Sequence, residues 1–143
     1  MGLLETIIGF VLMGITLEVF WTSIFNYKKT KNPRLIGHTY LWMFLIYSVV
    51  PFIYIFVLNN LNSSIYLRSI IYMVSFYLLE FIFWYLIRKF VGVSPWDYSN
   101  YFIKIFGKKY KSNFLGLVCV EYAPIWYLYG VVGELYFLFL INL

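Results

Sequence analysis

Glutamates inside long apolar segments are the residues of this chain with the clearest chemical potential. Glu18, Glu80 and Glu121 each lie among aliphatic and aromatic neighbours. An ionised side chain at a bilayer centre costs at least about 2.5 kcal/mol, so such residues usually face a bundle interior or a wet cavity. There a carboxylate can move protons, bind a cation or hydrogen-bond a polar ligand. A protonated glutamate can also act only as a clamp between helices.

The depth of these carboxylates is the second observation. Glu18 lies nine residues before a basic loop, Glu80 eight before Arg88, and Glu121 eight after the expected start of the last helix. At 1.5 Å per residue, each is about 12–14 Å inside the same boundary. Glu134 is expected near the opposite boundary, by itself. The sequence therefore predicts three carboxylates at one level.

A polar corner, Trp96-Asp97-Tyr98-Ser99, follows the segment that carries Glu80. We expect it to form the rim of a polar site, although Asp97 can instead cap a helix. His38 opens the second helix, where it can meet that rim or simply lie in the interface. The predicted ligand-binding residues are Glu18, His38, Trp42, Tyr47, Glu80, Trp96, Asp97, Tyr98, Ser99, Asn113 and Trp126.

Composition places the chain among membrane proteins. Hydrophobic residues make up 63% and charged residues 12% of the 143, against about a quarter charged in soluble domains. Residues 1–143 are predicted to form a single integral membrane domain. The net charge of +5 does not indicate nucleic-acid binding, because the basic residues fall in short blocks between apolar segments. No zinc-ligand spacing or phosphate-binding loop is present, and no metal site is predicted.

Four segments are long enough to cross a hydrocarbon core of about 30 Å, which needs about 20 helical residues. They are 3–27, 39–58, 65–91 and 113–141, and Pro124 is expected to bend the last. Ten of the 11 Lys and Arg residues lie in or beside the first and third connectors. By the positive-inside rule, these basic loops are cytoplasmic and both termini lie outside the cell membrane.

The connector from Tyr98 to Lys111 carries apolar residues at helical spacing and lysines between them. We expect a short cytoplasmic amphipathic helix that binds anionic lipid through the Lys104–Lys111 segment. An ordinary polar loop is the alternative. The predicted fold is an all-α membrane protein, a four-transmembrane-helix bundle with this short helix between the third and fourth spans.

Several of these segments occur in the same order in a known family. They include Glu80-Phe81, the Trp96 to Ser99 corner and Asn113-Phe-Leu-Gly116. Over nearly its whole length the chain resembles the ABC-transporter type IV (CmpB-like) membrane proteins, to which the eukaryotic transmembrane protein 229 proteins are related. The resemblance implies a role in transport. The family-like positions are Glu18, Trp42, Tyr47, Glu80, Trp96, Asp97, Tyr98, Ser99, Asn113, Gly116 and Trp126. Bulky Trp84 and the long lysine-rich connector depart from the family.

The function favoured by these features is a transport or small-ligand-binding membrane subunit with a carboxylate site that faces the cytoplasmic leaflet. The alternatives are a membrane-embedded lipid-modifying enzyme that uses Glu and Asp carboxylates, and a non-catalytic structural or regulatory scaffold. Catalytic residues and cofactors are left open. Because no Walker motif is present, ATP-driven transport would need a separate ATPase subunit. Four helices make a thin wall around a pore, so transport would also favour a homo-oligomer.

Overall fold

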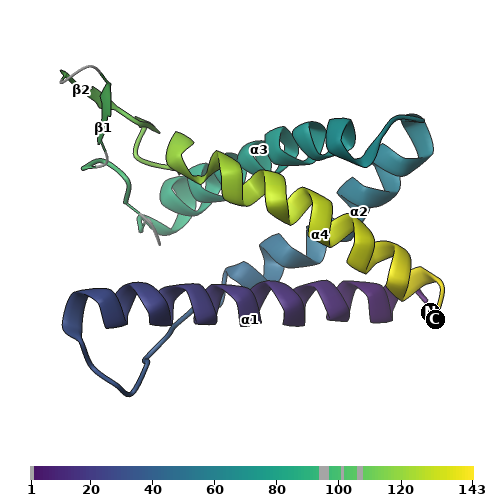
Figure 1. Ribbon diagram of the computed structural model, residues 1–143, viewed down its shortest axis with the longest axis horizontal. Coiled ribbons are helices and arrows are strands. Elements are labelled where there is room, and N and C mark those ends of the chain that lie inside the picture. The colour runs from purple at the N-terminus through teal and green to yellow at the C-terminus, as the bar shows by residue number, and fades with distance from the viewer. Residues whose placement is uncertain (1, 94–96, 101, 106–107) are drawn as a thin grey trace. The chain divides into compact units, whose positions relative to one another are not determined.

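The computed structural model describes residues 2–93, 97–100, 102–105 and 108–143 (Figure 1). Its helices are α1 (Leu3–Thr30), α2 (Met43–Asn60), α3 (Ile65–Val91), the short 3₁₀ turn η1 (Val120–Tyr122) and α4 (Ala123–Ile141). Four helical segments in these ranges are long and apolar enough to cross a membrane. The predicted all-α arrangement of four helices is therefore confirmed, and the chain is a multi-pass membrane protein.

Local capping explains why α3 has the predicted bounds. Ser64 precedes the helix in extended conformation, and its Oγ accepts a hydrogen bond from the backbone N–H of Leu67. Gly92 ends it with φ +79°, and its N–H donates to the carbonyl of Arg88. Serine before a helix and glycine after it satisfy backbone groups that the helix leaves unpaired. These two residues stop α3 on both sides.

The basic ends of α1 and α3 extend past the length that a bilayer core requires. The two helices have 28 and 27 residues, about 42 and 40 Å at 1.5 Å per residue. Both end in a pair of cations, Lys28 and Lys29 in α1, Arg88 and Lys89 in α3. Such side chains suit both the headgroup region and the negative end of the helix dipole.

The start of α4 differs from the prediction. The helix begins at Ala123, not at residue 113, and so Pro124 lies in its first turn. A proline there costs no hydrogen bond, because the first backbone N–H groups of a helix have no partner within it. The expected bend at Pro124 is therefore wrong.

The connector before α4 holds strands where we expected a helix. Strand β1 (Phe102–Ile105) pairs antiparallel with β2 (Lys108–Lys111), and β3 (Asn113–Phe114) pairs with β4 (Val118–Cys119). The predicted amphipathic helix is therefore wrong over these ranges. Aromatic and β-branched residues favour strands, and Gly107 would cost a helix about 1 kcal/mol.

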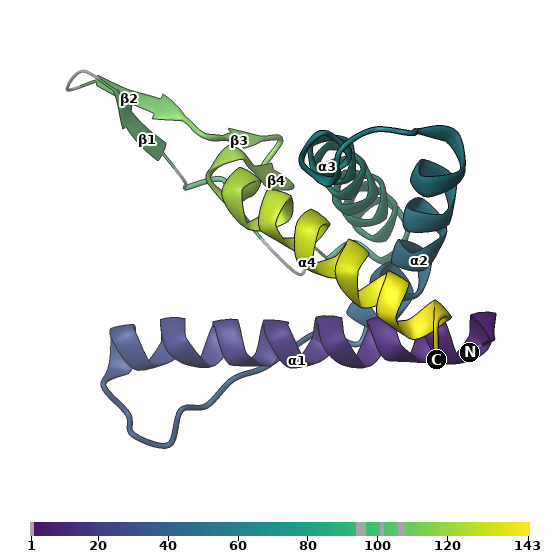
Figure 2. The same ribbon diagram turned by 45° about the vertical axis from the view of Figure 1, so that its right-hand side comes forward.

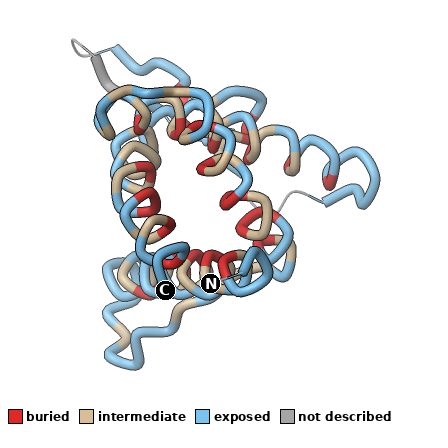
Figure 3. Tube along the Cα trace, turned by 90° about the vertical axis from the view of Figure 1, so that its right-hand side faces the viewer, coloured by how far each residue is buried: buried red, intermediate tan, exposed pale blue. Residues whose placement is uncertain are grey.

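The chain divides into two compact units. Figure 3 marks the buried residues along the chain. Unit 1 comprises Met1–Phe52 and Phe137–Leu143. Within it the rings of Phe10 and Phe137 lie 6.3 Å apart, and Gly14 packs against the ring of Tyr47. A Cβ at Gly14 would lie 2.5 Å from that ring, so only glycine permits this contact.

Unit 2, Ile53–Tyr136, has an aromatic core. Tyr54 and Tyr72 are fully buried with ring centroids 4.4 Å apart, and Phe76 contacts both rings. The hydroxyl of Tyr54 donates to the carbonyl of Tyr129 on α4 at 3.0 Å. This aromatic layer joins the second half of α2 to α3 and α4.

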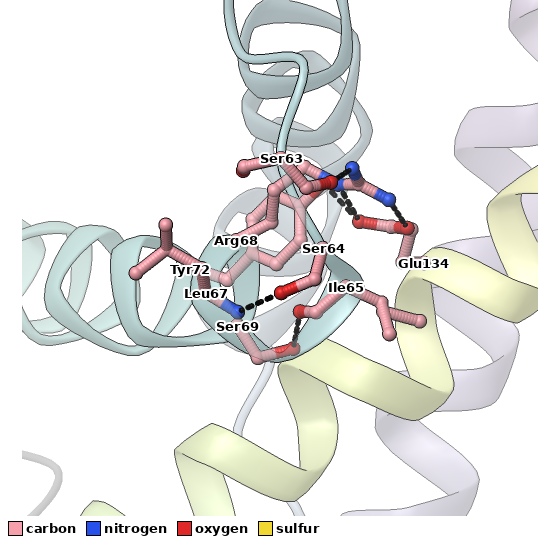
Figure 4. A network of polar contacts seen from close by, with 8 residues as sticks. All are labelled: Ser63, Ser64, Ile65, Leu67, Arg68, Ser69, Tyr72 and Glu134. Carbon is pink, nitrogen blue, oxygen red and sulfur yellow. Dashed lines mark hydrogen bonds and ion pairs between the residues drawn. The ribbon is translucent and has the colours of Figure 1, made fainter.

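Glu134 is not alone, contrary to the expectation from the sequence (Figure 4). Two nitrogens of Arg68 contact its carboxylate, Nη2 to Oε1 at 2.5 Å and Nε to Oε2 at 2.8 Å. The hydroxyl of Tyr72 donates to Oε2 at 2.7 Å, and Arg68 also donates to the carbonyl of Ser63. Glu134 is 1% exposed, so this paired charge locks the start of α3 to α4.

Removing the cation should destabilise the protein strongly. Arg68→Met leaves the carboxylate of Glu134 buried without a counter-charge, and we expect it to lower the free energy of unfolding by about 3–5 kcal/mol. Urea unfolding in detergent micelles measures the change. Arg34→Met, at an exposed loop position, should alter stability by no more than about 0.5 kcal/mol. A loss below about 1 kcal/mol for Arg68→Met would contradict the ion pair.

Candidate functional site

Glu18 is the buried carboxylate of unit 1. It lies on the middle of α1 and is 9% exposed. The hydroxyl of Thr39 donates to its Oε2 at 2.6 Å, and the hydroxyl of Tyr47 approaches the same oxygen at 3.4 Å. Oε1 is buried and has no hydrogen-bond partner among the described residues. One oxygen of this carboxylate is therefore an unused acceptor.

The connector between α1 and α2 delivers Thr39 to this carboxylate, because it runs back along α1 (Figure 1). The Oγ1 of Thr22 accepts from the N–H of His38 at 2.9 Å and donates to its carbonyl at 2.8 Å. Asn26 donates to the carbonyl of Ile36 at 3.0 Å. These bonds align the extended connector with the helix.

Of the residues predicted in this region, Tyr47 contacts Glu18 directly. His38 is exposed and is bonded to α1 through its backbone, while its ring packs edge-on against Tyr40. Trp42 lies in the turn before α2 and is half-buried. Thr39 was missed, and its place directly after the predicted residue His38 was the only signal; its hydroxyl is a hydrogen-bond donor, which a buried carboxylate requires.

Glu80 is the buried carboxylate of unit 2, 8% exposed on α3. The side chains of Trp84, Tyr98 and Trp126 lie beside its carboxyl, although Nε1 of Trp126 is buried without a hydrogen-bond partner in the described part of the chain. Trp84 lies four residues further along α3 on the same face, and Trp126 lies in the first turn of α4. The structure thus brings together three predicted site residues, and it adds Trp84, which is fully buried. The i+4 spacing from Glu80 was the available signal.

The corner after α3 is built from short backbone contacts. The N–H of Tyr98 donates to the carbonyl of Gly116 at 2.9 Å, and the N–H of Gly116 donates to Oδ1 of Asn113 at 3.1 Å. Leu115 and Gly116 both have positive φ, 54° and 72°, in the tight turn between β3 and β4. The predicted residues Tyr98 and Asn113 therefore meet here, and Asn113 holds the turn.

Asp97 shapes the same corner without facing Glu80. Its Oδ1 accepts from the backbone N–H of Ser99 at 2.9 Å. Hydrogen bonds from the Ser99 side chain and backbone, with a smaller contribution from Arg88, lower the pKa of this exposed carboxyl. Its stabilising effect is therefore present above the ordinary pKa of aspartate and is lost as pH falls through the lowered value. Trp96 lies outside the described residues.

The corner is attached to α3 at two levels. Nη1 of Arg88 donates to the carbonyl of Leu115 at 3.4 Å, and the hydroxyl of Tyr77 donates to the carbonyl of Cys119 at 2.9 Å. The ring of Phe114 lies 5.5 Å from that of Phe81. The segment from β3 to η1 therefore runs along the last turns of α3, on which Glu80 lies.

Glu121 does not join the buried carboxylates. It lies in η1 and is exposed, and its Oε1 accepts from the hydroxyl of Ser112 at 3.1 Å. The predicted depth depended on a helix that begins at residue 113, whereas α4 begins at Ala123. Glu18 and Glu80 belong to different units, so a joint site of the two stays a prediction. In the described part of the chain, His, Cys, Asp and Glu form no group of three that could hold a metal ion.

No model of a known protein family matches the chain, and no solved structure matches it. The resemblance to the CmpB-like membrane proteins stays a prediction.

Thr39→Val should destabilise the protein through Glu18. The substitution keeps the shape of the side chain but removes the donor 2.6 Å from Oε2, and we expect a loss of about 1–2 kcal/mol. Thermal unfolding in detergent measures it. Thr16→Val on α1, the helix that carries Glu18, is the matched control, because the exposed hydroxyl of Thr16 donates only to a carbonyl of its own helix. Equal effects of the two substitutions would show that Thr39 contributes nothing particular to Glu18.

Gly116→Ala should disrupt the corner more than a comparable change elsewhere. A Cβ at Gly116 would lie 2.6 Å from Oγ of Ser99, on top of the strain of φ +72°. Gly92→Ala carries a similar strain at φ +79° but meets nothing within 4 Å. We therefore expect faster amide hydrogen exchange over residues 97–100 in Gly116→Ala alone. Unchanged exchange there would contradict the described packing.

Proposed function

We propose that the protein is a transport or small-ligand-binding membrane subunit in which two buried carboxylates, Glu18 of unit 1 and Glu80 of unit 2, each bind a small cationic ligand that can donate hydrogen bonds. The observation that carries this proposal is the buried Oε1 of Glu18, which no described residue satisfies. An unsatisfied buried acceptor is costly in apolar surroundings, and a bound donor or cation would remove that cost.

The geometry around Glu18 supports a ligand role over a purely structural one. A clamp gains most when every polar atom is paired, as Glu134 is by Arg68 and Tyr72. In Glu18, by contrast, the hydroxyls of Thr39 and Tyr47 both contact the same oxygen, Oε2. Its second oxygen is buried and receives no hydrogen bond from a described residue, which is the acceptor that we propose a ligand satisfies.

Glu80 supports the proposal through its surroundings and its depth. The carboxyl lies beside two indole groups and a phenol, aromatic groups that favour cations at their ring faces. Glu18 lies ten residues before Lys28, and Glu80 eight before Arg88, about 15 and 12 Å along the helix. In a four-span topology these depths are similar.

Orientation and partners follow from the charge distribution. The loops after α1 and α3 carry most of the lysine and arginine residues, which favours a cytoplasmic position for both and an outside position for both termini in the cell membrane. Energy-driven transport would require a separate ATPase subunit, and a pore would require further copies of the chain. The resemblance to the CmpB-like membrane proteins also favours a role in transport.

The test is charge displacement by purified protein in liposomes. Concentration jumps of methylammonium and of sodium should each be tried on a solid-supported membrane. Glu18→Gln and Glu80→Gln remove the negative charge while keeping most of the side-chain shape. We expect each to raise the cation concentration that gives half of the maximal displaced charge about tenfold, which corresponds to about 1.4 kcal/mol of binding free energy.

Glu5→Gln is the matched control, because Glu5 is an exposed carboxylate in the first turn of α1. It should leave the signal unchanged, and all three variants must retain the thermal midpoint of the original protein. If Glu18→Gln and Glu80→Gln keep both the fold and the signal, the carboxylates are structural clamps and the scaffold interpretation holds. If the charge-displacement signal is lost only in variants that also lose the thermal transition, the scaffold interpretation is likewise supported.

A further inference from the structure

The antiparallel ribbon of β1 and β2 is rich in lysine and takes no part in the contacts described for Glu18 and Glu80. It projects from the end of unit 2 where α3 ends and α4 begins (Figures 1 and 2). Lys108, Lys109 and Lys111 are all exposed, as are the apolar residues Phe102, Ile103 and Tyr110. No acidic residue occurs between Asp97 and Glu121. The ribbon thus carries cations without neighbouring anions in sequence.

The register divides these residues between two faces. Phe102 pairs with Lys111, and Ile103 pairs with Tyr110. Partners in an antiparallel pair share a face, and adjacent pairs alternate. Lys109 and Lys111 therefore share one face with Phe102, while Tyr110 and Ile103 share the other. Each face offers large apolar surface close to a positive charge.

The ribbon also lacks what normally stabilises a hairpin. A two-stranded ribbon is marginally stable in water on its own, and a hydrophobic face usually packs against another element. Here the described side chains of both strands are exposed. A surface that supplies apolar contact together with negative charge would cover the exposed apolar residues and neutralise the exposed lysines.

We infer that the β1–β2 ribbon docks on the anionic lipid headgroups of the membrane that the helices cross. Charge complementarity selects an anionic surface, and the mixture of aromatic, aliphatic and lysine side chains suits the interface between headgroups and acyl chains. The bilayer is also the nearest such surface. Ten residues separate Val91, at the basic end of α3, from Phe102, and the corner at Asn113–Cys119 is attached to α3 itself.

Amide hydrogen exchange of the full chain in lipid nanodiscs tests this inference. One preparation contains phosphatidylcholine alone, and the other an equimolar mixture of phosphatidylcholine and phosphatidylglycerol. We expect the amides of residues 102–105 and 108–111 to exchange at least about fivefold more slowly in the anionic mixture, the factor that a single surface lysine contributes. Raising the salt concentration should remove the difference.

Variants identify the residues responsible. The triple variant Lys108→Gln, Lys109→Gln, Lys111→Gln should lose the lipid-dependent protection. The matched control Lys28→Gln, Lys29→Gln, Lys31→Gln removes the same charge from the end of α1 and should retain the lipid-dependent protection of the ribbon. Exchange in α3 should be identical in all three proteins, which separates loss of docking from loss of folding.

Two outcomes would overturn the inference. Equal exchange of the ribbon in both bilayers would exclude anionic lipid as its partner and leave an acidic protein as the remaining class. Protection that appears in phosphatidylcholine alone when inorganic phosphate is added would show that a free anion, and not the lipid surface, is recognised.

Discussion

A carboxylate buried in an apolar helix must receive hydrogen bonds or a counter-charge, and three glutamates of this protein meet that requirement to different degrees. Glu134 has a bidentate arginine and a tyrosine hydroxyl, so both of its oxygens are satisfied. Glu80 has two indoles and a phenol around it. Glu18 has two hydroxyls on one oxygen and none on the other. The fully paired Glu134 is therefore a structural charge, whereas Glu80 and Glu18 are candidate binding groups.

The helices carry the carboxylates, but the connectors bring several of the donors. Thr39 reaches Glu18 because the extended chain before α2 is tied to α1 through Thr22 and Asn26. Tyr98 reaches Glu80 because its backbone is tied to Gly116, which is possible only where a residue without a Cβ can approach Ser99 closely. Changes in these loops would therefore alter the electrostatics of the membrane interior without touching a helix.

Physical signals of different strength explain which features could be predicted. Long apolar runs identify four spans almost uniquely, and Ser64 and Gly92 mark the ends of α3 in the sequence. The hairpin was missed because short runs of aromatic and aliphatic residues satisfy helical and strand periods alike. The later start of the last helical segment places Glu121 in its first turn and not eight residues inside it, and the pairing of Glu134 with Arg68 joins positions 66 residues apart that no local pattern connects. Tyr47, Tyr98 and Trp126, which we predicted as ligand-binding residues, lie beside the carboxylates, since large polar aromatics are the few donors in so apolar a chain; their role in ligand binding stays a prediction.

The unequal lengths of the helices have a consequence for the surrounding lipid. Helix α1 has 28 residues and α2 has 18, about 42 and 27 Å. Even without its basic last turn, α1 is about 37 Å long from Leu3 to Tyr27, so lipids that border these two helices meet apolar surfaces that differ by about 10 Å in height, and no bilayer of uniform thickness matches both. Either α1 is strongly inclined or the acyl chains near it are stretched relative to those near α2. Each arrangement costs fractions of a kcal/mol per ångström of mismatch. The distribution of the protein among membranes should therefore depend on their thickness.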